Sequence, residues 1–194
     1  VVANDTDAPM RASVCGTLVN FIGTDGLHGK PQQNKNLWRE RTGIRGLEMR
    51  SEGVPSDAKQ WGTIALTVLE ASEQTVTHRT AWHDVPWGDA LLDFWDDFSA
   101  DGELHDRPAG QTDSPTGSLA VAVDLEPGAE RSITFLLAWH FPNRLTWDVM
   151  RTDDAETDWI GNYYATQFRD GWHVAEDIAE RLPALERDTV EFVR

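Results

Sequence analysis

The sequence contains a single cysteine, Cys15, among its 194 residues. An internal disulfide and a zinc cluster of several thiolates are therefore excluded. No apolar run approaches the length that crosses a bilayer, so no transmembrane segment is predicted. The chain opens on Val1 without a basic and then apolar signal segment, which favours a piece of a longer protein. We expect a cytoplasmic location.

Positive charge is also scarce. Lys and Arg together number 17 against 33 Asp and Glu, which gives a formal net charge of −16. Nucleic-acid footprints are basic, and an anionic membrane surface repels an acidic protein. The composition therefore argues against both partners. Nine Trp supply large apolar areas for a core.

Short segments suited to strands and separated by turns dominate the first two thirds of the chain. We predict strands at residues 11–22, 43–50, 61–69, 75–82, 119–125 and 133–141. This arrangement predicts a mainly β fold, and it is typical of an antiparallel β-sandwich. The amide-rich stretch 27–41 is predicted as a long surface loop, either functional or simply mobile.

Helical spacing replaces the strand pattern in two regions. Residues 88–99 are predicted as a helix with Asp residues toward solvent; its apolar face carries Leu91, Leu92, Trp95 and Phe98. C-terminal α-helices are predicted at 158–168 and at 171–193, the second interrupted near Pro183. We place a boundary in the acidic segment 148–156. It divides the chain into a β-sandwich, residues 1–150, and a helical segment, residues 151–194.

The stretch 117–147 is predicted to form the centre of the sandwich. Its two apolar runs flank a turn that contains Pro127 and Gly128, so we predict a hairpin. The second run is apolar on both faces, as in a strand covered on both sides, and should end at Pro142. The aromatic and polar corner after it is either the edge of a site or a domain contact. The candidate residues are Trp139, His140, Asn143, Arg144 and Trp147.

Motifs of nucleotide-binding, hydrolase and zinc sites are missing. The sequence contains no GxGxxG, P-loop, GxSxG or HExxH, so no metal and no cofactor are predicted. Carboxylates are so numerous that close pairs carry no information about glycoside hydrolysis, which needs two facing carboxylates. Asp96, Asp97 and Asp101 are predicted to form a solvated helix face and its exit loop.

Several motifs together resemble one known family. The most specific are residues 135–144 (FLLAWHFPNR) and 162–168 (NYYATQF), the second followed by Trp172. They follow, in order, residues 19–23 (VNFIG), 87–89 (WGD) and 94–98 (FWDDF). The chain resembles the N-terminal domain of glycoside hydrolase family 116, which contains β-glucosidases and non-lysosomal glucosylceramidase. The resemblance covers most of the chain.

The resemblance implies a β-sandwich followed by an (α/α)6 catalytic domain in the same polypeptide. Residues 1–150 would then be the later part of a sandwich whose first part is missing, and residues 151–194 the start of the catalytic domain. It implies retaining hydrolysis of a β-glucoside or glucosyl lipid by a Glu nucleophile and an Asp acid/base. Both would lie in the helical domain beyond this sequence, so no catalytic residue is assigned here. The chain would be inactive alone, pack on the catalytic domain and help to shape its entrance.

Two other functions stay open. The chain could be a free-standing carbohydrate-binding or protein-interaction sandwich, or a helper domain of an unrelated polysaccharide enzyme. An exposed Trp in a groove would favour a free-standing binding module. Solvent exposure of Trp172, Ile178 and Leu182 would favour a missing partner domain.

Overall fold

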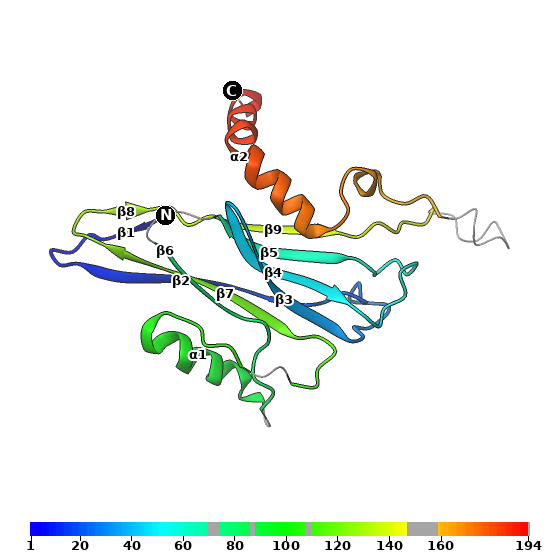
Figure 1. The fold of residues 1–194 in the computed structure, drawn as a ribbon, viewed down its shortest axis with the longest axis horizontal. Helices are drawn as coiled ribbons and strands as arrows, with labels where there is room; N and C mark the ends of the chain where they lie inside the picture. The colour runs from blue at the N-terminus through cyan, green and yellow to red at the C-terminus, as the bar shows by residue number, and fades with distance from the viewer. Residues whose placement is uncertain (70–73, 86–87, 108–109, 147–158, 194) are drawn as a thin grey trace.

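Two antiparallel sheets face one another in the computed structural model, with one helix on the outer face of each sheet (Figure 1). The structure describes residues 1–69, 74–85, 88–107, 110–146 and 159–193. The predicted mainly β, antiparallel fold with a C-terminal helix is confirmed.

Each sheet contains strands from distant parts of the chain. One has the order β2–β7–β6, and the other has the order β3–β4–β5–β9. The first contains β2 (Met10–Val19), β6 (Gln74–Arg79) and β7 (Thr116–Leu125). The second contains β3 (Asn34–Arg41), β4 (Ile44–Ser51), β5 (Thr63–Leu69) and β9 (Phe135–His140). The short strands β1 (Val2–Ala3) and β8 (Glu130–Arg131) pair with each other.

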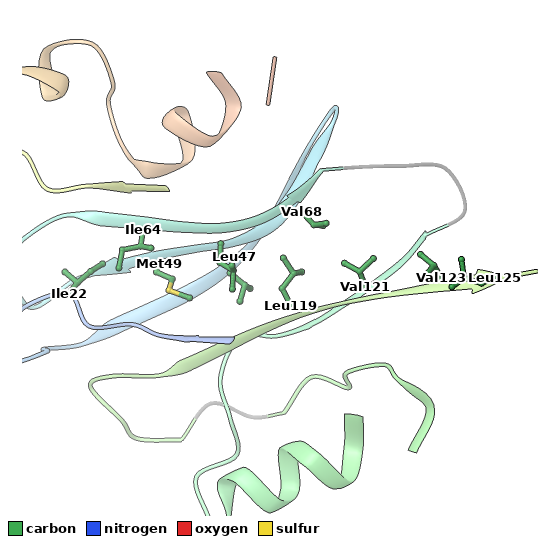
Figure 2. Packing of buried hydrophobic residues seen from close by; sticks show 10 residues of the cluster. Ile22, Leu47, Met49, Ile64, Val68, Leu119, Val121, Val123 and Leu125 are labelled. Atoms are coloured by element: carbon green, nitrogen blue, oxygen red, sulfur yellow. The ribbon is translucent and has the colours of Figure 1, made fainter. Parts of the chain in front are cut away.

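Alternating side chains of the central strands build the core between the sheets (Figure 2). In β5, Ile64, Leu66 and Val68 point into this core, and Leu119 and Val121 meet them from β7. The residues between them point outward, toward a helix on each side. Both strands are therefore covered on two faces, which explains their nearly continuous apolar sequences.

Helix α1 (Ala90–Asp101) covers the three-stranded sheet, but not with the predicted face. Phe94 and Phe98 pack toward the sheet, whereas Leu91, Leu92 and Trp95 are exposed. Two ion pairs cause this rotation, because the fully buried Arg79 of β6 binds Asp93 and Asp97 on the inner side of the helix. The prediction of a solvated face is therefore wrong for Asp97.

Helix α2 (Gly171–Val193) begins on the four-stranded sheet and leads away from it (Figure 1). Its first turns pack on the sheet through Trp172 and Ala175, while Val190 and Phe192 near its end are exposed. The helix continues through Pro183, so the predicted interruption is wrong. No helix in the described part of the chain is long and apolar enough to span a membrane.

The predicted hairpin is wrong, because β7 and β9 belong to different sheets. The turn itself forms: Ala129 N–H donates to the Glu126 carbonyl at 3.0 Å, and Gly128 has a φ of 73°. The pairing of β8 with β1 then leads the chain across to the other sheet. There β9 is an edge strand, so the expectation that it is covered on both sides is also wrong: Leu137 is 51% and Trp139 58% exposed.

Two other predictions of local structure need correction. Residues 34–41 form the strand β3 instead of a loop, because the amides of Asn34 and Asn36 are buried and bonded to backbone carbonyls. In the described part of 158–168, the helical structure is the short 3₁₀ turn η2 (Tyr163–Thr166). The predicted boundary at 148–156 lies outside the described residues.

Candidate functional site

Four of the five candidate residues lie at the end of β9. Trp139 and His140 complete the strand, and Asn143 and Arg144 follow Pro142. The strand stops at His140, as the nearby proline predicts. Trp147, the fifth candidate, lies outside the described residues. We refer to residues 140–146 as the corner.

Trp139 and His140 point to opposite faces of the sheet. Trp139 lies opposite Ile64, whose side chain belongs to the core between the sheets, and adjacent strand residues alternate. Because β9 is at the edge, Trp139 remains exposed, whereas His140 is only 5% exposed. The two side chains therefore do not line a common pocket.

Tyr164 of η2 packs against His140. The two rings meet edge to face, with centroids 5.6 Å apart and planes at 74°. Nε2 of His140 is buried and has no hydrogen-bond partner in the described structure. A buried polar atom without a partner costs free energy, so the ring contributes here through packing.

Asn143 and Arg144 tie the corner to neighbouring segments. The side-chain amide of Asn143 donates to the carbonyls of Ser56 and Ala58, both at 2.8 Å. The carbonyl of Arg144 accepts hydrogen bonds from Ile160 N–H at 2.9 Å and from Gly161 N–H at 3.1 Å. These contacts fix the backbone of the corner between the loop before β5 and residues 159–166.

Tyr164 and Asn162 hold the corner most directly, and sequence reasoning gave them no role. The Tyr164 hydroxyl donates to the Phe141 carbonyl at 2.6 Å and accepts from Phe141 N–H at 3.0 Å. Asn162 donates its side-chain amide to the same carbonyl at 2.7 Å and its backbone N–H to the Pro142 carbonyl at 2.8 Å. Both residues lie in the motif 162–168, which was the available signal.

Replacing Tyr164 with phenylalanine should loosen this attachment. The substitution leaves Phe141 N–H without its acceptor, and because this donor is only partly buried the cost is at most about 1–3 kcal/mol. We expect faster hydrogen exchange of the Phe141 and Asn162 amides. Tyr163→Phe is the matched control, because Tyr163 is 82% exposed. Equal exchange rates in the two variants would contradict the proposed role of the Tyr164 hydroxyl.

An apolar groove of about 260 Å³ lies beside the corner, between β9 and α2. Its lining consists of apolar residues from both elements: Leu136, Leu137, Ala138, Trp139, Val174, Ala175 and Ile178. Trp159, Ile160 and Tyr163, on the segment attached to the corner, are exposed as well. The end of β9 therefore presents apolar surface on a fixed backbone.

A comparison with protein families gives a match over most of the chain. A family model described as "beta-glucosidase 2, glycosyl-hydrolase family 116 N-term" matches residues 1–185. The chain belongs to glycoside hydrolase family 116. No curated protein matched it. The predicted resemblance to the N-terminal domain of the family is confirmed.

The corner of this family 116 domain supplies no catalytic carboxylate pair. Residues 140–146 and 159–166 contain neither Asp nor Glu. Retaining glycoside hydrolysis needs two carboxyl groups about 5–5.5 Å apart. Within the described ranges, no group of three His, Cys, Asp or Glu side chains could hold a metal ion. The surface at this end of β9 is suited to contact with an apolar partner.

Proposed function

We propose that this domain is the non-catalytic N-terminal portion of a retaining β-glucosidase or glucosylceramidase-like hydrolase. In this proposal it packs on a helical (α/α)6 domain of the same polypeptide, which acts on a β-glucoside or glucosyl lipid. The groove between β9 and α2 carries the proposal, because it joins exposed apolar side chains to a helix that leads away from the sandwich. The corner would then wall one side of the entrance to the active site.

The chemistry of the groove also bears on the alternative of a free-standing carbohydrate-binding module. Exposed Trp139 lines the groove, which is the feature expected of such a module. The lining side chains, however, have no polar groups besides the indole N–H to bind sugar hydroxyls. An apolar protein surface is the better match.

Exposed apolar side chains on the C-terminal helix would favour a missing partner domain, and the structure shows them only in part. Trp172 is buried on the sandwich, against the expectation for a helix that lacks its partner. Ile178 and Leu182 are half-buried, and the exposed apolar side chains lie farther along, at Val190, Phe192 and Val193. In our proposal, these later turns of α2 belong to the helical catalytic domain.

A charge in the groove should disrupt the proposed contact. In the polypeptide that joins this domain to the helical domain, Leu137→Asp would bury an unpaired carboxylate at the interface, at a cost of about 2–5 kcal/mol. We expect at least a tenfold loss of kcat/KM toward an aryl β-glucoside. In the 194-residue chain alone, the same exposed position should tolerate the change within about 0.5 kcal/mol.

Leu27→Asp is the control for this experiment, because Leu27 is exposed on the loop after β2. It should leave kcat/KM unchanged. If Leu137→Asp behaves like this control, the groove is not the contact surface. Release of glucose from an aryl β-glucoside by the purified 194-residue chain would overturn the proposed non-catalytic role.

A further inference from the structure

A larger and more polar pocket lies away from the corner, at the edge strand β3. It has a volume of about 540 Å³ and is lined by residues of three segments, 33–37, 80–81 and 110–115, together with Glu52. This volume falls within the range of small-molecule sites. Neither the groove nor the corner shares a residue with it.

Buried asparagines fix the walls of this pocket to one another. The side-chain amide of Asn36 donates to the carbonyls of Thr80 at 2.8 Å and Pro115 at 3.2 Å, which joins all three segments. Fully buried Asn20 donates its own amide to Asn36 Oδ1 at 3.0 Å. The pocket is thus preorganised, which lowers the entropy cost of binding.

Backbone strain is held at the rim of the same pocket. Gln33 has a φ of 49°, and it is the one described residue other than glycine with a positive φ. Its N–H donates to Asp113 Oδ1 at 2.7 Å, and its carbonyl accepts from Glu52 N–H at 3.2 Å. Strained conformations that surrounding contacts maintain are concentrated at functional sites.

The lining combines an apolar surface with unused hydrogen-bonding groups. Leu37 contributes a partly exposed apolar side chain, whereas Ala81 and Pro115 of the lining are buried. The side-chain amides of Gln33 and Gln111 are exposed and have no hydrogen-bond partner among the residues that the structure describes. Each amide offers both donors and an acceptor, the combination that binds vicinal hydroxyl groups.

Charges at the rim compensate one another. Lys35 and Arg50 both pair with Glu52, and the hydrogen bond from Lys35 lowers the pKa of the Glu52 carboxyl from its ordinary value. Asp113 is engaged by Gln33 N–H. A charged ligand would have to compete with these pairs, whereas a neutral ligand can use the free amides.

From these observations we infer that the pocket beside β3 binds a neutral polyhydroxylated molecule of about the size of one sugar ring. Leu37 contacts the C–H face of the ligand. Gln33 and Gln111 bind its hydroxyl groups. This binding site is separate from hydrolysis and does not depend on a helical partner domain.

Titration of the 194-residue chain with methyl β-D-glucopyranoside, followed by amide NMR shifts, tests this inference. We expect saturable shifts at Gln33, Gln111 and Thr112. Gln111→Ala should weaken binding ~10-fold, the equivalent of one lost hydrogen bond to the ligand. Glucuronate and glucosamine, which carry opposite charges, should both bind more weakly than the neutral glucoside.

Gln167→Ala is the matched control, because it removes another exposed amide, at the end of η2. It should leave binding unchanged while Gln111→Ala weakens it. The absence of saturable shifts would overturn the inference, as would saturable shifts confined to the corner. Unchanged affinity in Gln111→Ala, or tighter binding of either charged sugar, would also overturn it. None of these outcomes depends on catalytic activity.

Discussion

Replacement of Trp172 with alanine is expected to remove about 3–5 kcal/mol from the free energy that holds α2 on the sandwich. Trp172 is 1% exposed and packs with Ile44, Ala65 and Ala138 on the outer face of the four-stranded sheet. Arg39 lies over its ring, 4.8 Å from the centroid. Truncation leaves a cavity that the surrounding sheet cannot fill.

Two polar contacts also hold the first turn of α2, one of them made by the Trp172 side chain. The indole N–H of Trp172 donates to Glu176 Oε1 at 2.9 Å, and Gly171 N–H donates to Thr63 Oγ1 at 2.7 Å. Hydrogen exchange of the α2 amides, together with urea unfolding, measures the free energy lost in Trp172→Ala. Trp95→Ala is the control, because Trp95 is exposed on α1 and should change stability by about 0.5 kcal/mol or less. Similar values for both variants would exclude Trp172 as the anchor of α2.

The second large effect is expected at Asp97. Arg79 is 0% exposed, with Nη1 2.7 Å from Asp93 Oδ2 and Nη2 2.7 Å from Asp97 Oδ2. Asp97→Ala leaves this guanidinium undercompensated, and breaking a buried ion pair costs about 3–5 kcal/mol. Asp96→Ala, one residue earlier on the exposed side of α1, is the control and should cost little. Urea unfolding of both variants checks the difference.

A double-mutant cycle and a pH series sharpen this test. Combining Arg79→Met with Asp97→Ala should cost less than the sum of the single effects, because the charges are lost together. Burial raises the pKa of Asp97, but the hydrogen bond from His105 N–H and the ion pair with Arg79 outweigh this effect and lower the pKa overall. The carboxylate therefore stabilises the fold above the unfolded pKa of about 3.9, and this contribution is lost as pH falls through the lower folded pKa. Additive single effects, or a pH slope unchanged in Asp97→Ala, would argue against the coupling.

The sequence predicts the strands better than their partners. β2, β4, β5, β6, β7 and β9 lie close to the predicted ranges, because periodic apolar patterns act locally. The predicted hairpin between residues 119–125 and 133–141 is wrong, since the turn at Gly128 suits a change of sheet as well as a hairpin. Which strand pairs with which depends on contacts across the whole chain.

The orientation of α1 is a second feature that the sequence does not predict. Leu91, Leu92 and Trp95 have the spacing of a core-facing stripe, yet they are exposed. The orientation depends on Arg79, which precedes the helix on another element and whose burial no local pattern reveals. In the corner, likewise, the motif containing Tyr164 was visible in the sequence, but its hydrogen bonds to Phe141 were not.

The pairing of β2 with β7 has a consequence for synthesis of the protein. Met10 pairs with Leu125, and every strand neighbour of β2 comes from this late segment. Contacts between residues so far apart in sequence slow folding, and chains emerge from the ribosome N-terminus first. β3, β4 and β5 can associate early, but β2 must wait for β7. The sheet of β2, β7 and β6 therefore forms only after β7 has left the exit tunnel.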